Sequence, residues 1–225
     1  MIRALSRRLS KGASDDAGLS LTELLVAMMI SSMVLVMVGA MFINVAEVTT
    51  NSNATTTRSS DAANIMGEVS RVIRTASNNA VSTSVQSDPA IVSATATELT
   101  VYSYIDTSPA NPAPTKVTFR FDAQNRMVED RVAATVSANY WVFTGTATTR
   151  TLGGPVTTAG TFTYLDSTGA VLPIATGGLT LAQRALVASV RVTVTIANSP
   201  TTGSDPVVIT NTVGMPNLKI SRTDD

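Results

Sequence analysis

Residues 18–45 read GLSLTELLVAMMISSMVLVMVGAMFINV, and this stretch decides how the rest of the chain is interpreted. A glycine comes first, Glu23 is the one charged residue, and residues 24–45 form an apolar run without charge. Residues 1–18 hold four basic and two acidic side chains, which makes them a basic, hydrophilic leader. A secretory signal peptide places its apolar stretch before the cleavage site, which is the opposite order. Cleavage after the glycine would leave the apolar segment on the mature protein, with a free amine at Leu19.

The apolar run is long enough to cross a membrane as a helix. At 1.5 Å per residue it spans about 33 Å, and the hydrocarbon core of a bilayer is about 30 Å thick. The basic leader should stay in the cytoplasm, so the chain after about residue 46 is expected outside. On hydropathy alone, this segment is equally well interpreted as a plain single-pass anchor.

Glu23 is the unusual residue of this segment. A carboxylate in the membrane is unfavourable by roughly 2.5–3.5 kcal/mol on insertion scales and usually marks a function. An amine at Leu19 would lie one helical turn away and could neutralise Glu23 of a neighbouring subunit as helices pack side by side. The sequence Ser20-Leu21-Thr22-Glu23 also fits a helix capping box, in which an acid is favourable at the helix N-terminus. The two roles are compatible.

At these residues the chain resembles the type IV prepilins and the type II secretion pseudopilins. Their signature is a short basic leader, a glycine, a hydrophobic first mature residue, three residues, a glutamate and an apolar helix. Gly18, Leu19 and Glu23 occupy the three diagnostic positions, with Leu19 where the family usually has phenylalanine. The resemblance implies that a prepilin peptidase cleaves between Gly18 and Leu19 and methylates the amine of Leu19. It also implies that Glu23 serves in subunit docking.

Two departures from the family pattern point away from a major, load-carrying pilin. Gly39-Ala40 stands where many major pilins have a proline, and a chain without cysteine cannot close their C-terminal disulfide loop. A weaker likeness to the larger minor subunits of the PilW and pseudopilin-J type rests on residues 162–169, 187–194 and 207–218.

The composition excludes several classes of function. Charged residues make up 14% of the 225-residue chain, the net charge is zero, and both cysteine and histidine are absent. Disulfides, Cys/His zinc sites and imidazole-based catalysis are therefore excluded. No nucleotide-binding loop or nucleophile elbow occurs in a workable context. A nearly neutral ectodomain gives no electrostatic footprint for nucleic acid, so direct DNA binding is not expected.

The residues after the apolar run predict a second, amphipathic half of the helix. The stripe Ala62, Ile65, Met66, Val69, Val72, Ile73 and Ala76 has helical spacing and should be buried. Glu68, Arg71 and Arg74 lie off the stripe and are expected to face solvent, with Glu68 and Arg71 as an i,i+3 pair. One helix is predicted from about Leu19 to Ala76, weakest near residues 49–57 because Thr, Ser and Asn are poor helix formers.

Alternation with period two predicts strands after residue 77. Expected strands cover residues 99–104, 117–121, 127–129, 140–144, 161–165, 186–197 and 207–213. Expected loops cover residues 108–114, 153–155 and 199–206, and the Thr-rich region 144–160 is expected to be an exposed hairpin or loop. An amphipathic helix followed by antiparallel strands gives an α+β fold with a long N-terminal hydrophobic helix, as in pilins. The expected organisation is a cleaved leader at 1–18, a transmembrane and assembly helix at 19–45, its amphipathic continuation at 46–77 and a β-rich extracytoplasmic domain at 78–225.

Few ectodomain residues are candidates for chemistry. Asp122, Glu129, Asp130 and Asp166 are acids near turns, but one or two acids cannot supply the six to eight oxygens that calcium prefers. The sequence at Asp166 is better interpreted as an ordinary turn. Trp141 and its aromatic neighbours could form an exposed contact, although the alternation favours one or two of them filling the core.

Together, these features predict a non-enzymatic minor pilin or pseudopilin, a structural subunit of a type IV pilus or a type II secretion-like filament. A tip or initiation complex is one place that such a subunit can take. No cofactor or metal is expected. The implied partners are other pilin subunits, the prepilin peptidase, an inner-membrane assembly platform and the membrane itself. The expected location is the cytoplasmic membrane, single-pass with the N-terminus inside, and then a periplasmic or extracellular filament. The alternatives are a filament-displayed adhesin or DNA-uptake subunit, an uncleaved single-pass envelope protein and, least favoured, a hydrolase.

Overall fold

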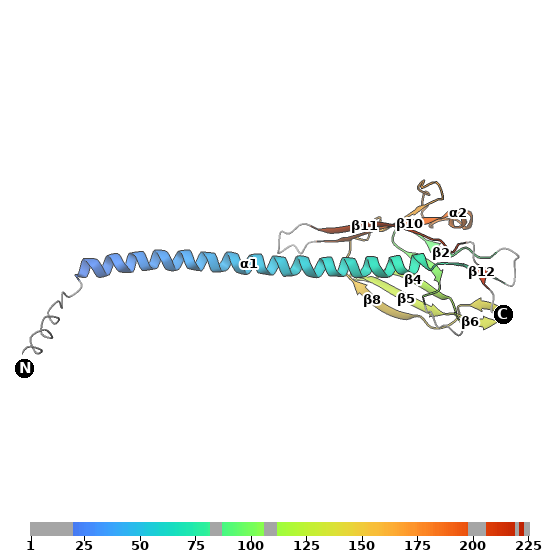
Figure 1. The fold of residues 1–225 in the computed structure, drawn as a ribbon, viewed down its shortest axis with the longest axis horizontal. Helices are drawn as coiled ribbons and strands as arrows, with labels where there is room; N and C mark the ends of the chain where they lie inside the picture. Colours follow the sequence, from blue (N-terminus) through green and yellow to red (C-terminus); the bar gives the residue numbers. More distant parts are fainter. Residues whose placement is uncertain (1–19, 82–86, 106–111, 198–205, 219–220, 223–225) are drawn as a thin grey trace, which may run out of the picture. The chain divides into compact units, whose positions relative to one another are not determined.

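The computed structural model describes residues 20–81, 87–105, 112–197, 206–218 and 221–222 (Figure 1). The chain divides into two compact units, residues 1–50 and residues 51–225. The described elements are α1 (Leu21–Arg74), β1 (Asn78–Asn79), β2 (Ile91–Ala94), β3 (Leu99–Ser103), β4 (Thr115–Phe121), β5 (Met127–Ala133), β6 (Thr135–Ser137), β7 (Tyr140–Val142), β8 (Thr148–Gly153), β9 (Phe162–Leu165), α2 (Leu181–Leu186), β10 (Ser189–Ile196), β11 (Val207–Gly214) and β12 (Ser221–Arg222).

The helix α1 is continuous over 54 residues, which confirms the predicted long helix with slightly shorter ends. Its first unit, up to residue 50, exposes its apolar side chains, because this part of the helix has no face buried against other described residues. In the second unit the predicted stripe is buried: Ala62, Ile65, Val69, Val72, Ile73 and Ala76 have no exposed surface, and Met66 is 7% exposed.

The larger sheet of the second unit is antiparallel, with the strand order β2-β3-β4-β5-β8. Alternate residues of β4 are buried, as expected for a strand with one face against the core. The predicted strands at 99–104, 117–121 and 127–129 correspond to β3, β4 and β5. Asn125 has a φ of 55° and donates its backbone N–H to the Asp122 carbonyl, which forms the turn between β4 and β5.

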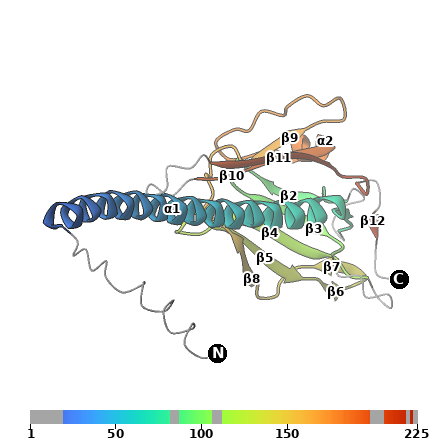
Figure 2. The same ribbon diagram turned by 60° about the vertical axis from the view of Figure 1, so that its left-hand side comes forward.

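A three-stranded sheet, which we call the smaller sheet, has the antiparallel order β11-β10-β9, and the remaining strands form two-stranded pairs, β1-β12 and β6-β7. Its central strand β10 buries Val190, Val192, Val194 and Ile196 on one face. In the second unit, α1 runs alongside both sheets, with β10 and β11 on one side and β5 and β8 on the other (Figure 2). Side chains of the helix and of both sheets form one hydrophobic core. The α+β class predicted from the sequence is confirmed.

The prediction from the sequence missed two elements, β8 and α2, and began one strand too early. Residues 144–160 were predicted as an exposed loop or hairpin, but they contain β8, which pairs with β5 at the edge of the larger sheet. The strand predicted from residue 186 begins at Ser189, because the preceding residues form α2. The Thr180 hydroxyl accepts from the Gln183 backbone N–H, and the Gln183 side chain accepts from the Thr180 N–H. This capping box is visible in the sequence as Thr-x-x-Gln, a signal that the alternation of the following strand obscured.

Candidate assembly site

The N-terminus of α1 is held by the capping box that the sequence predicted. The Glu23 backbone N–H donates to Ser20 Oγ at 3.2 Å, and the Ser20 N–H donates to Glu23 Oε2 at 3.1 Å. The Glu23 carboxylate therefore lies against the positive end of the helix, where a negative charge is favourable. Both residues are solvent-exposed. Gly18 and Leu19, the predicted processing residues, lie outside the described part of the chain.

The surface of α1 after Glu23 is apolar and uncovered. A window of this helix has a mean hydropathy of 2.4 and is long and apolar enough to cross a membrane. None of that window is buried inside the molecule; Leu35 is 74% exposed and Phe42 is 76% exposed. Ser32 donates its hydroxyl to the Met29 carbonyl at 2.8 Å, so this polar group needs no partner outside the helix. An uncovered apolar helix of this length requires lipid or other helices around it.

The Thr-rich stretch between the two halves of α1 stays helical. Hydroxyls of Thr49, Thr50, Thr55, Thr56 and Thr57 each donate to the carbonyl four residues earlier, at 2.8–3.0 Å. These bonds occupy polar groups that would otherwise compete for non-helical partners. The stretch that the sequence marked as the weakest part of the helix is therefore helical, with these hydroxyls bonded within the helix itself.

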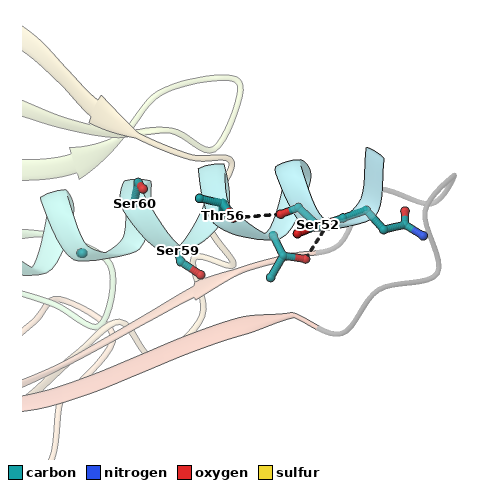
Figure 3. Close-up of a pocket in the computed structure, with 7 residues that line it drawn as sticks. Ser52, Thr56, Ser59 and Ser60 are labelled. Atoms are coloured by element: carbon teal, nitrogen blue, oxygen red, sulfur yellow. Dashed lines mark hydrogen bonds between the residues drawn. The ribbon is translucent and has the colours of Figure 1, made fainter. Parts of the chain in front are cut away.

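A shallow polar groove of about 620 Å³ follows this stretch, lined by residues between Asn51 and Ala63 (Figure 3). Figure 3 shows Ser52, Thr56, Ser59 and Ser60 along the helix, with the Thr56 hydroxyl donating to the Ser52 carbonyl at 2.9 Å. The lining contains no ionisable side chain among the described residues, so it carries no group suited to acid–base chemistry or metal binding.

A cluster of charges joins the second half of α1 to the larger sheet. Glu68 was predicted to face solvent, and that prediction was wrong: its side chain is only 16% exposed. Glu68 Oε1 lies 2.5 Å from Arg71 Nη2, 2.8 Å from Arg131 Nη2 and 3.2 Å from Arg150 Nη2. Two of these arginines come from β5 and β8, so local helical spacing could not reveal them.

Glu129 on β5 is the deepest member of this cluster, with a side chain that is completely buried. Arg150 Nη2 donates to Glu129 Oε2 at 2.7 Å from the facing position on β8. Arg131 Nε lies 3.0 Å from Glu129 Oε1, but its N–H is not directed at that oxygen, so the contact is an ion pair without a hydrogen bond. Glu129 is therefore a structural residue that anchors two arginines, and its position leaves it closed to solvent.

The environment of Glu68 favours its charged form. Burial by itself raises the pKa of the Glu68 carboxyl, but the hydrogen bond and charge of Arg71, and the charges of Arg150 and Arg131, lower that pKa below its ordinary value. Glu68 lies beyond the apolar run, in the globular unit. Glu68 therefore remains charged at neutral pH, and its ion pairs with Arg131 and Arg150 hold the helix against the sheet.

The remaining acids near turns are occupied locally. Asp166 Oδ1 accepts from the backbone N–H groups of Thr168 and Ala170, and Gly169 has a φ of +84°, which confirms the ordinary turn. Asp122 Oδ1 accepts from the N–H groups of Gln124 and Arg126. Asp130 forms an ion pair with Arg120 at 2.6 Å. Within the described residues, no three carboxylates gather where they could hold a metal ion.

The aromatic residues around Trp141 are largely accounted for by packing. Trp141 is 9% exposed, which confirms that at least one of them fills the interior. Phe143 is half-buried and stacks on Tyr102 with ring centroids 4.7 Å apart. These contacts leave no exposed aromatic cluster at this position.

Comparison with known families identifies the N-terminal segment. A model of the prokaryotic N-terminal methylation motif matches residues 14–39, which include the predicted processing residues, Glu23 and most of the apolar run. The chain carries this motif. The match supports a type IV pilin-like protein that is processed by a prepilin peptidase and anchored in the membrane by its N-terminus. Such proteins are structural and assemble with other pilins. No curated protein matches the chain.

Proposed function

We propose that this chain is a minor pilin or pseudopilin that enters a filament of the type IV pilus or type II secretion class. The observation that supports the proposal is the match to the methylation motif over residues 14–39, a segment that includes Gly18, Leu19 and Glu23. In this proposal residues 1–18 are removed as a leader, and the peptidase cuts between Gly18 and Leu19 and methylates the new amine of Leu19. The globular part from residue 78 is extracytoplasmic.

The exposed apolar surface of α1 supplies the physical reason for assembly. Moving this helix from lipid into a bundle of like helices exchanges lipid contacts for helix–helix contacts at little cost. Glu23 has no cationic partner among the described residues, and only its capping bonds hold it. In a filament, the amine of Leu19 on a neighbouring subunit would neutralise this carboxylate. Glu23 then leaves an unfavourable environment and gains a charge partner, which also fixes the axial register.

We assign the chain a minor role, of the PilW or pseudopilin-J type that its strand pattern resembles. Two features of the sequence support this role. The chain has no cysteine, so the disulfide of many major pilins is absent. The apolar run also has Gly39-Ala40 at the place where many major pilins have a proline. A place in the tip or initiation complex follows from this minor role.

Processing is tested by the N-terminal mass of the full-length protein, expressed in cells with an active prepilin peptidase. We expect wild type to begin at methylated Leu19, and Gly18→Ala to keep Met1 and the leader. Gly12→Ala is the matched control, because it changes a leader glycine outside the matched segment, and it should be cleaved like wild type. An uncleaved wild-type protein in these cells would contradict the proposal and leave a single-pass envelope protein.

A further inference from the structure

The strand β11 has a free edge that other described segments do not cover. The Met215 N–H donates to the Ala188 carbonyl at 3.0 Å, and the register pairs Val213 with Val190. Odd-numbered residues of β11 therefore bond to β10, because antiparallel pairs alternate along a strand. Backbone groups on the other edge belong to Val208, Thr210, Thr212 and Gly214. None of these groups bonds to another backbone group among the described residues.

The other outer strands of the two sheets are protected. On β2, the Arg184 guanidinium donates to the carbonyls of Ile91 and Val92. On β9, the Phe162 N–H donates to the Ala96 carbonyl at 3.1 Å, and the Tyr164 carbonyl accepts from Leu172 at 2.9 Å. Such cover prevents a sheet edge from recruiting a further strand.

The outer strand β8 is protected in a different way, by irregularity and charge. Its pairing with β5 shifts register between Met127 and Val128, and it carries Arg150. By contrast, β11 is regular over eight residues, and it contains no proline and no charged residue. The β11 edge therefore lacks the features that protect the other outer strands of these two sheets.

An open groove of about 640 Å³ lies beside this edge, between α1 and β11. We call it the β11 groove; its helix wall includes Ala63, Met66, Gly67 and Ser70, and its strand wall is Ile209 and Asn211. A Cβ added at Gly67 would meet nothing within 4 Å, so this part of the wall has room above it. A strand added to β11 would direct every second side chain towards this groove.

The charge of the β11 groove selects its occupant. Arg71 and Arg74 line it, whereas no carboxylate does so among the described residues. Arg71 is already bonded to Glu68, but Arg74 forms no ion pair within the described part of the chain. An incoming segment with a carboxylate at this end would therefore be favoured over one with a cation.

We propose that the β11 edge binds an extended segment of a different filament subunit, which adds a strand to the smaller sheet. The segment places a small apolar side chain above Gly67 and a carboxylate beside Arg74. A second copy of this chain pairing β11 with β11 would form a two-fold contact, which closes a dimer instead of extending a filament. The identity of the partner as a filament subunit rests on the proposed function; the binding edge does not.

Binding is tested with capped seven-residue peptides of alternating valine and threonine, in which one glutamate is moved along the valine face. The full-length protein in detergent micelles is titrated with labelled peptide by fluorescence anisotropy, and amide hydrogen exchange of β11 is followed. We expect the best glutamate peptide to slow exchange at Thr210 and Thr212 at least tenfold. The same peptide with lysine should bind at least tenfold more weakly. Arg74→Glu should reverse this preference, whereas Arg191→Glu, on the outer face of the sheet, should not.

Thr210→Pro and Thr210→Ala form the matched pair of variants. Proline removes the N–H that points away from β10, so the strand keeps its own ladder bonds while its edge is blocked. We expect Thr210→Pro to abolish peptide binding and Thr210→Ala to retain it, with the amides of Asn211 and Val213 protected in both. Equal binding by Thr210→Pro, or no slowing at Thr210 and Thr212, would overturn the proposal. Slowing that depends on protein concentration without peptide would overturn it in favour of self-pairing. Because this test needs no cleavage, an unprocessed protein would refute the proposed function alone.

Discussion

The two halves of α1 contain similar side chains, but the first half exposes them and the second half buries them. In the first half Ile30 is 58% exposed, whereas Ile65 in the second half has no exposed surface. Glu23 is held only by its capping partners, whereas Glu68 meets three arginines of its own chain. The side chains of the second half pack and form ion pairs within the subunit. The first half leaves its apolar face and its carboxylate for other molecules, and this difference is what a subunit made for assembly requires.

The buried charge cluster should show the largest effect of a single substitution. Removing one partner of a buried ion pair leaves the other charges uncompensated, which typically costs about 3–5 kcal/mol. We expect Glu129→Ala to lower the free energy of unfolding by this amount. The measurement is denaturant unfolding of the full-length protein in detergent, followed by the fluorescence of Trp141, the chain's one tryptophan. Glu47→Ala, which changes an exposed acid of α1, should match wild type. Equal stability of the two variants would show that the cluster does not hold helix and sheet together.

The isoleucine pair sharpens the comparison of the two halves. Ile65→Ala leaves a cavity in the core and should reduce the free energy of unfolding by about 2–5 kcal/mol. Ile30→Ala removes the same atoms from an exposed position and should leave the unfolding of the globular unit unchanged. The same tryptophan-monitored unfolding measures both variants. A comparable loss for Ile30→Ala would mean that the first half is also packed within the subunit.

The loss of folding stability at acidic pH should depend on Glu68 and Asp130. Burial would raise the pKa of the Asp130 carboxyl, but hydrogen bonds from Arg120 and Thr149 lower it, as the arginines do for Glu68. Groups whose pKa is lower in the folded state stabilise it above their unfolded pKa, and this contribution is lost as the pH falls through the folded value. We expect stability to fall between about pH 5 and pH 3. The slope of unfolding free energy against pH should be smaller in Glu68→Gln and unchanged in Glu47→Gln; an unchanged slope in Glu68→Gln would contradict the assignment.

The smallest effect is expected at the two capping boxes. Losing a cap costs about 0.5–2 kcal/mol of local helix stability. Thr180→Ala, in the globular unit, should therefore reduce the free energy of unfolding measured by Trp141. Ser20→Ala should leave that value unchanged and only speed amide exchange at Glu23, whose N–H loses its acceptor. Loss of global stability in Ser20→Ala would contradict the separation of the two halves.

The elements with strong periodicity could be predicted from the sequence, and those that depend on distant partners could not. The buried stripe from Ala62 to Ala76 and the alternation in β4 follow from local spacing alone. The burial of Glu68 depends on Arg131 and Arg150, which reach it only after β5 and β8 have paired. The strand β8 itself is Thr-rich and exposed, so it has no hydrophobic alternation to mark it. The processing residues Gly18 and Leu19 were predicted from order and spacing alone, and they stay a prediction. The free edge of β11 could not be predicted, because it depends on the register between β10 and β11.

The most direct test of the central claim is the fraction of each variant recovered in sheared filaments from cells that assemble them. Glu23→Ala removes the acid in the first turn of α1, and Glu47→Ala removes an acid that follows the apolar run of the same helix. We predict that both are cleaved, that Glu47→Ala enters filaments like wild type, and that Glu23→Ala is reduced at least tenfold in the sheared fraction. Incorporation of cleaved Glu23→Ala at the wild-type level would contradict the claim that this carboxylate finds its partner in a neighbouring subunit.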